Sequence, residues 1–533
     1  MNIRETMMNV VERHGARVFL VDANTRHEIT FRHFHRQACA LAAELRRRGV
    51  RKGDRVGVML PNCCELAVLY FACIYLGAVI VPINPMLSTN EVRFILGSCK
   101  PALVVCGRLN ADSVREFHTN VLGLLTAQEA ETGGVNEIKI DDLSPREDFL
   151  PLENAEADDL IVIMYTSGTS AKPKGLAHKV GRMFRNAMAF ASAQGINEDS
   201  RFYLTLSMAY MGGFYNLLVL PFLCGASVVV DHVFDARSSL HFWEKAKNNK
   251  VNTLWMAPTV LSILLRMDRG RTGEEFCRSS LRHVFVGFAP LPLKVKDEFE
   301  LRYGVCLIEN YGLSETLFVT ARSVDARGSQ GYVGEALPGI ALRIANDNGE
   351  PVAPATQGEV QILTPDLMAG YLDAEGRLLE ADALAWFATG DVGRLDGESS
   401  LSITGRKKDI IIRGGVNISP AAVEEVLMQV AGVAEVAVVS VPHELYGEDV
   451  VAVLKLEAGL EVELILESAA QHAKQNLAQH QQPARYMAID ELPRTSTGKV
   501  QKARIRELVA EKLQASSTSA FRKLGPEGAV VTR

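Results

Sequence analysis

The sequence of 533 residues lacks paired cysteines and has little charge imbalance. Its nine cysteines are scattered and none has the CxxC spacing, which argues against a disulfide framework or a zinc site and favours a reducing cytoplasm. The 57 Lys and Arg residues nearly balance 63 Asp and Glu residues, so the formal charge is −6. We therefore expect no nucleic-acid partner and no anionic membrane surface as a partner.

The sequence also lacks an apolar run of the kind that targets a chain to a membrane. Charges at Arg4, Glu5 and Glu12 interrupt the continuous apolar core that a signal peptide needs. The stretch 66–83 has no charged residue, but Gly77 divides it into a helix-like half and a β-branched half. We expect a buried helix followed by a buried strand here, and no membrane span.

The composition, with 47% hydrophobic and 23% charged residues, is that of an ordinary globular protein. Up to the charged segment 405–409, short apolar runs alternate with longer amphipathic stretches such as 34–48, which predicts sheets with helices on their faces. The clearest predicted strands are 55–60, 102–106, 161–165, 227–230 and 283–286. From 331 to 405, short strands broken by Gly, Pro and Asp predict a β-rich subdomain.

The charged, Gly-flanked segment 405–409 predicts a domain boundary, because such segments make few packed contacts. We predict an α/β fold in which a large N-terminal domain of α/β sheet subdomains and a β-rich subdomain is followed by a small mobile α+β domain. The predicted parts are a domain at 1–404, a hinge at 405–408, a domain at 409–515 and a flexible tail at 516–533. Within the small domain we expect helices at 420–429 and 464–479 and strands at 433–441 and 449–456.

One loop has the composition of a phosphate-binding site. Residues 165–175, YTSGTSAKPKG, follow a predicted strand and precede a helical stretch. Four Ser and Thr hydroxyl groups, the flexible Gly168 and two lysines offer the donors and positive charge that a polyphosphate needs. The loop is not a Walker A motif, because Pro173 stands where that motif requires glycine. Taken alone, it could equally be a solvated turn.

This loop closely resembles the signature loop of the adenylate-forming superfamily, which includes acyl-CoA synthetases, peptide-synthetase adenylation domains and luciferases. Further elements of that family follow in the same order along nearly the whole chain. They are GFAPL at 287–291, NYGLSE at 310–315, Gly358-Glu359 with Gly370-Tyr371, TGD at 389–391, GRKKD at 405–409, GGVNISP at 414–420 and PRTSTGK at 493–499. The chain is identified as a member of this superfamily, and it is most similar to AMP-forming acyl-CoA synthetases.

The resemblance implies that ATP activates a carboxylic acid to an acyl-adenylate, with release of pyrophosphate, and that the acyl group then passes to the thiol of CoA. It implies ATP, Mg²⁺ and CoA as cofactors and a small carboxylic acid as the partner. The phosphopantetheine of an acyl carrier protein is the alternative acceptor, and both monomer and homodimer stay open. Such a reaction must neutralise a polyphosphate leaving group and bring two anions together for in-line attack.

The resemblance also implies catalytic roles for Lys499, Glu315 and Thr166. The ammonium of Lys499 would stabilise the α-phosphate and the attacking carboxylate, and Glu315 would hold Mg²⁺. Taken as an isolated residue, Lys499 would be an exposed loop lysine. The set expected to bind ATP and AMP is Thr166, Ser167, Gly168, Thr169, Ser170, Lys172, Lys174, Gly287, Asn310, Tyr311, Gly312, Ser314, Asp391 and Arg406, with Asn310 and Tyr311 at the adenine and Asp391 and Arg406 at the ribose.

Lys408 stands at the position of the family's hinge, so the small domain would rotate between two poses. In one pose Lys499 would reach the α-phosphate. In the other, a path for the CoA thiol would open past Gly414 and Gly415, where the missing side chains leave room.

Several residues depart from the family's usual pattern, and the predicted acyl pocket contains most of them. That pocket is Tyr210, Met211, Phe214, Phe288 and Gly312. Met211 stands where relatives that activate α-amino acids have aspartate, so a buried ammonium would lack its partner and such substrates are disfavoured. Tyr210 replaces a frequent histidine, and Gly312 stands where acetate-restricted relatives have tryptophan. We expect a medium acyl chain or an aryl acid, although Phe214 and Phe288 could equally be core residues.

Other functions fit the sequence less well. A non-catalytic nucleotide-binding protein would have no need of Lys499, and a P-loop kinase would need a Walker A motif. A hydrolase or metalloenzyme would show GxSxG, HExxH or clustered His and Cys, whereas His443-Glu444 lacks a second histidine. Luciferase-like oxygenation has no distinct motif to support it.

Overall fold

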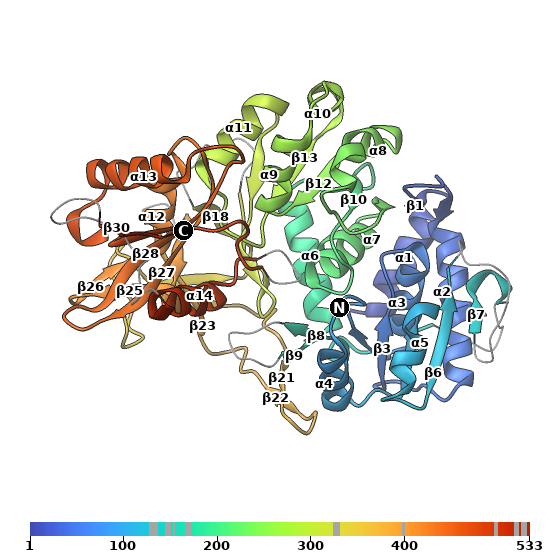
Figure 1. Ribbon diagram of the computed structural model, residues 1–533. Helices are drawn as coiled ribbons and strands as arrows, with labels where there is room; N and C mark the ends of the chain where they lie inside the picture. The colour runs from blue at the N-terminus through green and yellow to red at the C-terminus, as the bar shows by residue number, and fades with distance from the viewer. Residues whose placement is uncertain are drawn as a thin grey trace.

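The structure of the protein is a computed structural model that describes residues 1–126, 137–143, 151–152, 155–166, 173–322, 331–396, 400–494, 499–515, 522–523 and 530–532. Figure 1 shows a large N-terminal domain, coloured blue to yellow, and a small C-terminal domain in orange and red. The fold is mixed α/β, which confirms the predicted class. No helix among the described residues is long and apolar enough to cross a membrane.

Two largely parallel sheets form the body of the large domain. The first contains, in spatial order, β14 (Leu307–Glu309), β13 (His283–Val286), β12 (Thr253–Met256), β10 (Arg201–Leu204), β11 (Ser227–Val230), β1 (Val18–Asp22) and β2 (Glu28–Thr30). The second contains β22 (Leu378–Glu380), β21 (Gly370–Leu372), β9 (Lys174–Lys179), β8 (Leu160–Thr166), β4 (Val79–Pro82), β3 (Arg55–Met59), β5 (Leu103–Cys106), β6 (Val121–Leu125) and β7 (Glu137–Lys139). All five strands predicted from branched apolar runs are present.

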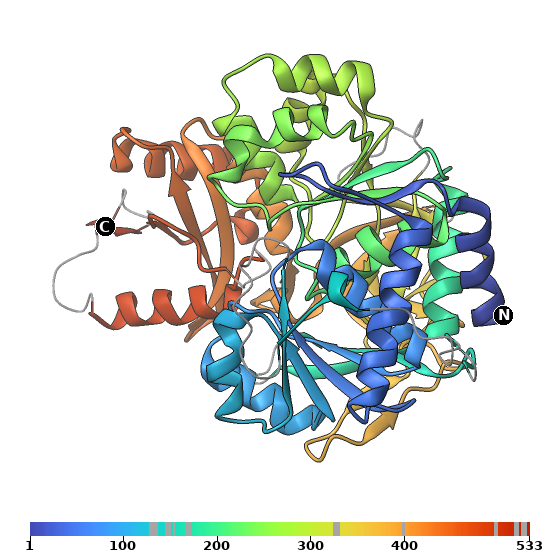
Figure 2. The same cartoon turned by 90° about the vertical axis from the view of Figure 1, so that its right-hand side faces the viewer.

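An apolar core fills the space between these two sheets, and further helices cover their outer faces (Figure 2). The inner layer includes α1 (Ile3–His14), α2 (Phe31–Arg47), α3 (Cys64–Leu76), α6 (Val180–Ala193), the π-helix η2 (Gly212–Val219) and α7 (Leu220–Leu223). The outer helices are α4 (Thr89–Cys99), α5 (Arg108–Arg115), α8 (Phe242–Asn248), α9 (Pro258–Met267), α10 (Thr272–Ser280) and α11 (Leu293–Tyr303). Helix α3 is apolar on all sides and is therefore buried, and β4 follows it as predicted for 66–83.

A third sheet, which is antiparallel, confirms the predicted β-rich subdomain. Its order is β17 (Thr320–Ala321), β18 (Tyr332–Ala336), β24 (Leu401–Arg406), β23 (Phe387–Leu395), β20 (Gly358–Leu363) and β19 (Ala341–Ala345). A short hairpin of β15 (Gly312–Leu313) and β16 (Leu317–Phe318) lies between this sheet and β14 in the sequence. Strands β23 and β24 carry the chain to the boundary of the small domain.

The small domain packs helices on a fourth sheet. Its strands are β26 (Val416–Ile418), β25 (Ile411–Arg413), β28 (Gly447–Leu456), β27 (Val433–His443), β29 (Arg485–Ala488), β31 (Val530–Thr532) and β30 (Arg522–Lys523), and its helices are α12 (Pro420–Met428), α13 (Val462–Asn476) and α14 (Lys502–Ala515). The helix expected at 464–479 ends at Asn476, because Leu477 is extended and a separate 3₁₀ turn follows at Gln479–Gln481. The rest of the predicted tail lies outside the described residues.

Within the described part of the chain, polar contacts join the small domain to the large one. Ser419 Oγ donates to the Thr404 carbonyl at 2.7 Å. Arg266 donates to the carbonyl of Ala434 at 2.9 Å, and Lys294 Nζ donates to that of Met428, at the end of α12, at 3.2 Å.

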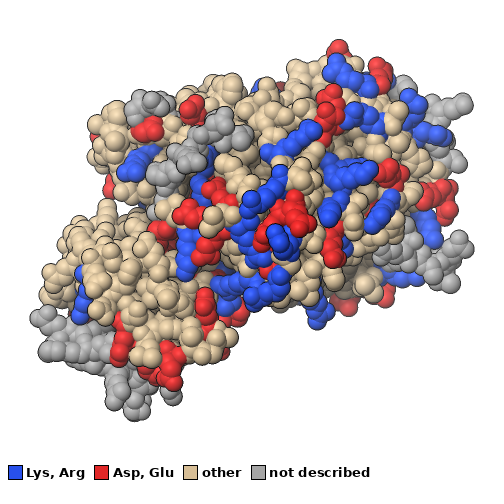
Figure 3. Space-filling view, turned by 90° about the horizontal axis from the view of Figure 1, so that it is seen from above, with Lys and Arg blue, Asp and Glu red and all other residues tan. Residues whose placement is uncertain are grey.

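Figure 3 shows basic and acidic side chains interspersed on the face seen from above, in keeping with the near balance of charge.

Candidate active site

A buried carboxylate organises the predicted nucleoside end of the site. Asp391 in β23 is 3% exposed. Its Oδ2 accepts a hydrogen bond from the Tyr311 hydroxyl at 2.7 Å, and its Oδ1 pairs with Arg406 Nε at 2.6 Å. Burial raises the pKa of Asp391, and Arg406 acts against that shift. Each carboxylate oxygen has a second lone pair, so Asp391 can still accept from a ribose hydroxyl.

The turn that carries Asp391 is held to the boundary segment by Glu359. Glu359 Oε1 accepts from the backbone N–H of Gly390 at 3.1 Å, and its Oε2 accepts from Lys407 Nζ, also at 3.1 Å. Thr389 Oγ1 accepts from the Asp391 backbone N–H at 3.0 Å. Gly390 has a φ of +70°, which glycine adopts without strain. The Gly358-Glu359 and TGD elements therefore form one structural unit.

A buried ion network, which the sequence did not indicate, lies beneath the predicted adenine residues. Glu309 ends β14 and pairs with Lys296 Nζ at 2.8 Å and with Arg322 at 3.6 Å. All three side chains are buried. The next residue, Asn310, donates to the Val286 carbonyl at 3.3 Å, and a Cβ at Gly287 would lie 3.3 Å from its Oδ1. The network therefore anchors the strand that presents Asn310 and Tyr311.

The predicted phosphate loop connects two antiparallel strands. Thr166, at the end of β8, is paired with Lys174, at the start of β9. The expectation that the loop leads into a helix was wrong, because β9 precedes α6. No helix terminus therefore follows the loop directly, and anion binding there would depend on its own N–H groups, hydroxyls and lysines. The predicted Ser167, Gly168, Thr169, Ser170 and Lys172 lie outside the described residues.

The predicted metal ligand, Glu315, is half-buried and has a hydroxyl partner. Its Oε1 accepts from the Tyr371 hydroxyl at 2.7 Å, and Lys174 Nζ lies 5.7 Å from the centre of the Tyr371 ring. Within the described part of the chain, no cluster of three or more His, Cys, Asp or Glu side chains could hold a metal. One carboxylate completed by phosphate oxygens and water suits Mg²⁺, so these residues fit that ion.

Lys499 from the small domain interacts electrostatically with both ends of this site. Asp391 and Glu315 are among its charged neighbours, as are Arg406 and Lys408. Lys499 is an exposed residue, yet desolvation by the protein around its ammonium, followed by Arg406, lowers its pKa, and the two carboxylates act in the opposite direction. The structure thus brings the predicted catalytic lysine to the predicted nucleotide residues.

The predicted acyl segment, residues 206–213, is fixed from behind by buried polar groups. Asn62 Nδ2 donates to the Leu206 carbonyl and its Oδ1 accepts from the Met208 N–H, both at 2.9 Å. Tyr210 accepts from Asn84 Nδ2 through its hydroxyl at 3.2 Å. Met211 immediately precedes the π-helix η2, and π-helical turns are frequent at functional sites.

Phe288 is the most unusual residue of the predicted pocket. Its φ is +72° and its side chain is 38% exposed. A Cβ at Gly212 would lie 2.9 Å from the Phe288 ring, so this ring packs directly on the start of η2. A Cβ at Gly312 would lie 2.1 Å from the Leu317 carbonyl, which explains the glycine there by backbone crowding. Phe214 is fully buried against Tyr70, with ring centres 5.1 Å apart, and so belongs to the core.

The predicted hinge and CoA path lie at the edge of the small domain. Lys408 is in the 3₁₀ turn η4 (Lys407–Asp409), and desolvation lowers its pKa. Gly414 and Gly415 have φ values of +58° and +82° and form the exposed turn between β25 and β26. A Cβ at Gly415 would meet no atom within 4 Å, so lack of space does not explain this glycine. Its role in this pose is to adopt the positive φ that the two-residue turn requires.

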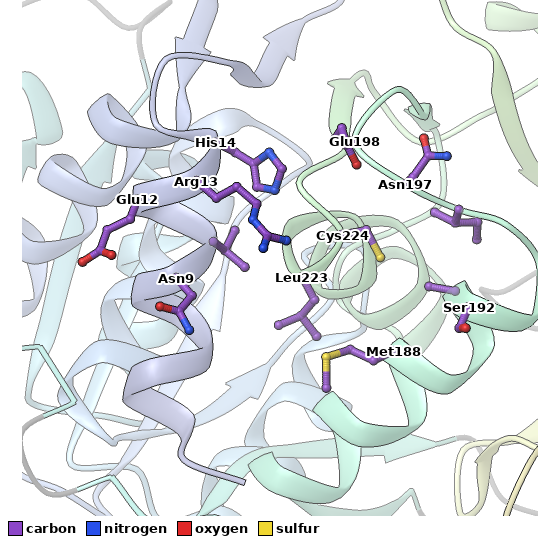
Figure 4. Close-up of a pocket in the computed structure, with 13 residues that line it drawn as sticks. Asn9, Glu12, Arg13, His14, Met188, Ser192, Asn197, Glu198, Leu223 and Cys224 are labelled. Carbon is purple, nitrogen blue, oxygen red and sulfur yellow. The ribbon is translucent and has the colours of Figure 1, made fainter.

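A cavity of about 800 Å³ lies away from all of these residues. Figure 4 shows it between α1, the end of α6 and the end of α7, with His14 and Arg13 directed into it. Its lining combines apolar side chains such as Val10 and Leu223 with charges of both signs, from Arg13, Glu12 and Glu198. None of the predicted site residues lines it.

Sequence comparison matches residues 8–372 to the family described as AMP-binding enzyme and residues 422–499 to the AMP-binding enzyme C-terminal domain. An indoleacetate–CoA ligase of Aromatoleum aromaticum is 33% identical over 488 residues, covering 89% of this chain and 91% of the relative. A medium-chain fatty-acid–CoA ligase of Escherichia coli is 27% identical over 524 residues, which cover 95% of this chain and 88% of the relative.

The fold also matches solved structures. The crystal structure of ATP-bound MatB from Rhodopseudomonas palustris superposes with a TM-score of 0.84 over 96% of this chain and all of that chain. At 24% sequence identity this likeness concerns the fold.

Proposed function

The chain belongs to the AMP-binding enzyme family and is an AMP-forming acid–CoA ligase, and from that premise we propose that it activates an aryl acid or a medium-chain acyl acid. The observation that carries the proposal is the ring of Phe288 packed on Gly212 beside Met211. These residues offer an apolar wall and no acidic partner for an ammonium group. The similarity to ligases for indoleacetate and medium-chain fatty acids supports the same substrate classes.

The residues described above would share the two half-reactions. Asn310 and Tyr311 would hold the adenine, Asp391 and Arg406 the ribose, and Lys499 would lie between the α-phosphate and the incoming carboxylate. The carboxylate oxygen attacks the α-phosphorus, the bond to the β-phosphate oxygen breaks, and pyrophosphate leaves. Mg²⁺ at Glu315 would neutralise the charge that develops on this leaving group.

In the second half-reaction the thiolate of CoA attacks the acyl carbonyl and AMP leaves with the electron pair of the broken bond. The small domain would first rotate at Lys408, which would withdraw Lys499 and bring Gly414 and Gly415 towards the acyl group. This rotation would separate the two steps in time, so that one site serves both.

The test is ATP–pyrophosphate exchange with short, medium, long, aryl and amino acids, followed by transfer to free CoA or to a phosphopantetheine carrier protein. We expect exchange with aryl or medium-chain acids and transfer to CoA. In a Phe288→Ala variant, which keeps the backbone constraint of a Cβ, longer or bulkier acids should gain relative to the wild-type substrate. Exchange restricted to acetate or amino acids would refute the proposed substrate class. Acyl transfer to the carrier protein and not to free CoA would show that the carrier protein is the acceptor.

A further inference from the structure

The loop that carries Glu315 is held by three contacts from other parts of the chain. The Tyr371 hydroxyl donates to the carboxylate at 2.7 Å, and the Met368 backbone N–H donates to the Glu315 carbonyl, also at 2.7 Å. The ring of His178 bonds the carbonyl of the preceding residue, Ser314, through Nε2 at 2.7 Å. Together these contacts fix the carboxylate and two successive carbonyl groups, so the loop has little freedom to reorient Glu315.

His178 is a fully buried residue of β9, and its ring makes one hydrogen bond, to Ser314. Because a carbonyl can only accept, Nε2 must carry a proton and donate it to Ser314. The other ring nitrogen, Nδ1, is buried and has no hydrogen-bond partner. An apolar side chain would fill the space without an unpaired nitrogen, so the benefit of the imidazole lies in its single bond to Ser314.

The segment that contains His178 also secures the other elements around Glu315. Lys174 and His178 are four residues apart in β9, so their side chains leave the same face of the strand. Lys174 lies over the Tyr371 ring. In the following helix, Arg182 donates to the Met368 carbonyl at 3.2 Å. One continuous segment therefore joins the end of the phosphate loop to both sides of the Glu315 loop.

We propose that His178 is a positioning residue for the metal: by holding Ser314 it sets the direction in which the Glu315 carboxylate meets the magnesium ion of MgATP. The inference rests on the proposed function, since it takes Glu315 as the Mg²⁺ ligand. His178 touches neither the metal nor the nucleotide and acts through the loop. Residues that orient a metal ligand in this way tune metal affinity more than they tune binding of the rest of the substrate.

The experiment compares His178→Leu and His178→Gln in the full-length protein. Glutamine can place an amide N–H near the position of Nε2, whereas leucine has no donor. Calorimetry measures ATP affinity with and without Mg²⁺, and pyrophosphate exchange is titrated with Mg²⁺. In His178→Leu the gain in ATP affinity from Mg²⁺ should fall by about tenfold or more, with metal-free ATP binding and the KM for the acid unchanged, and His178→Gln should stay within about twofold of wild type.

The matched control is His283→Leu. The ring of His283 stacks on Phe285, with ring centres 5.6 Å apart, and its removal should leave the Mg²⁺ dependence unchanged. If the leucine variant does not fold, His178→Asn replaces it, because its shorter amide cannot reach Ser314. Wild-type metal dependence in a folded Leu or Asn variant, or an equal loss in the control, would overturn the proposal. Wild-type protein that binds MgATP without exchanging pyrophosphate would contradict the proposed function instead, and the calorimetric comparison would still decide the role of His178.

Discussion

The predicted nucleoside end of the site and the predicted catalytic lysine differ in how the fold holds them. Asp391 is buried, and two side chains occupy both its oxygens, one of them reaching from the adjacent strand β24. Lys499, in contrast, comes from the small domain, which polar contacts such as those of Arg266 and Lys294 join to the large one. The predicted nucleoside residues thus lie within the large domain and its boundary strand, whereas the predicted catalytic lysine comes from the other side of the domain boundary.

This difference would let one chain carry out the two proposed half-reactions on one bound intermediate. A pocket built into a sheet keeps its geometry when the small domain moves. A charge carried by a separately folded unit can be withdrawn when that unit rotates. Binding and chemistry should therefore respond to different substitutions, and the following variants test that separation in order of decreasing effect.

Lys499→Ala should give the largest effect. We expect adenylate formation, measured by pyrophosphate exchange, to fall by about a thousandfold, because the two anions would lose the cation between them. Thioester formation from preformed acyl-adenylate should survive, and ATP binding should change little. An equal loss in both half-reactions would contradict the assignment.

The pH dependence of the same residue offers a control. Because the lowered pKa of Lys499 applies to an ammonium that is active when protonated, exchange should decline with rising pH before an ordinary lysine would titrate. In Lys499→Arg the remaining activity should persist to higher pH, because guanidinium stays charged. Identical alkaline limbs in the two proteins would assign the decline to another group.

Lys408→Pro should separate the half-reactions in the opposite sense. The hydrogen bonds of the 406–410 turn use the N–H of Ile410, so proline at 408 is compatible with the pose seen here. Restricting the backbone should slow thioester formation by about a hundredfold and leave exchange nearly intact. Lys408→Ala, which keeps backbone freedom, is the matched control, and single-turnover assays of each step measure both.

Asp391→Asn should weaken ATP binding by about tenfold, since the amide loses the charge that pairs with Arg406 and accepts from the ribose. Calorimetry with ATP measures this change, and Tyr311→Phe, which removes one hydroxyl from the same carboxylate, should have a smaller effect. Wild-type affinity in a folded Asp391→Asn protein would refute the ribose assignment.

Lys294→Ala should have the smallest effect. Removing its bond to the end of α12 loosens the pose that presents Lys499, so exchange should fall and thioester formation should rise, each by about twofold. The double variant with Arg266→Ala tests whether the two contacts act together. If both half-reactions slowed equally, the contacts would stabilise the fold without selecting a pose.

The sequence was sufficient where a signal is local. Branched apolar runs located β11 and β13, and a uniformly apolar helix followed by a strand located α3 and β4. Ordered motifs pointed to Asp391, Tyr311 and Lys499, which the structure brings to one region.

The contacts that hold the site could not be predicted, because they join residues far apart in the chain. His178 meets Ser314 across 136 positions, and Tyr371 meets Glu315 across 56. Lys296, Glu309 and Arg322 form their network only once α11, β14 and the residues after β17 are packed together. For His178 the sequence held only one weak signal, its place two residues after Leu176 on a short strand.

The left-handed backbone at Phe288 bears on how the range of acids that this protein accepts could change. A φ of +72° is costly for an aromatic residue, by about 1 kcal/mol or more, and glycine would remove that strain. Glycine at 288 would also remove the ring that lies on Gly212. A single substitution would then both widen the range of accepted acids and relieve backbone strain, whereas substitutions that create new activities usually lower stability. At this position the proposed narrower pocket, and not the wider one, would be the strained state.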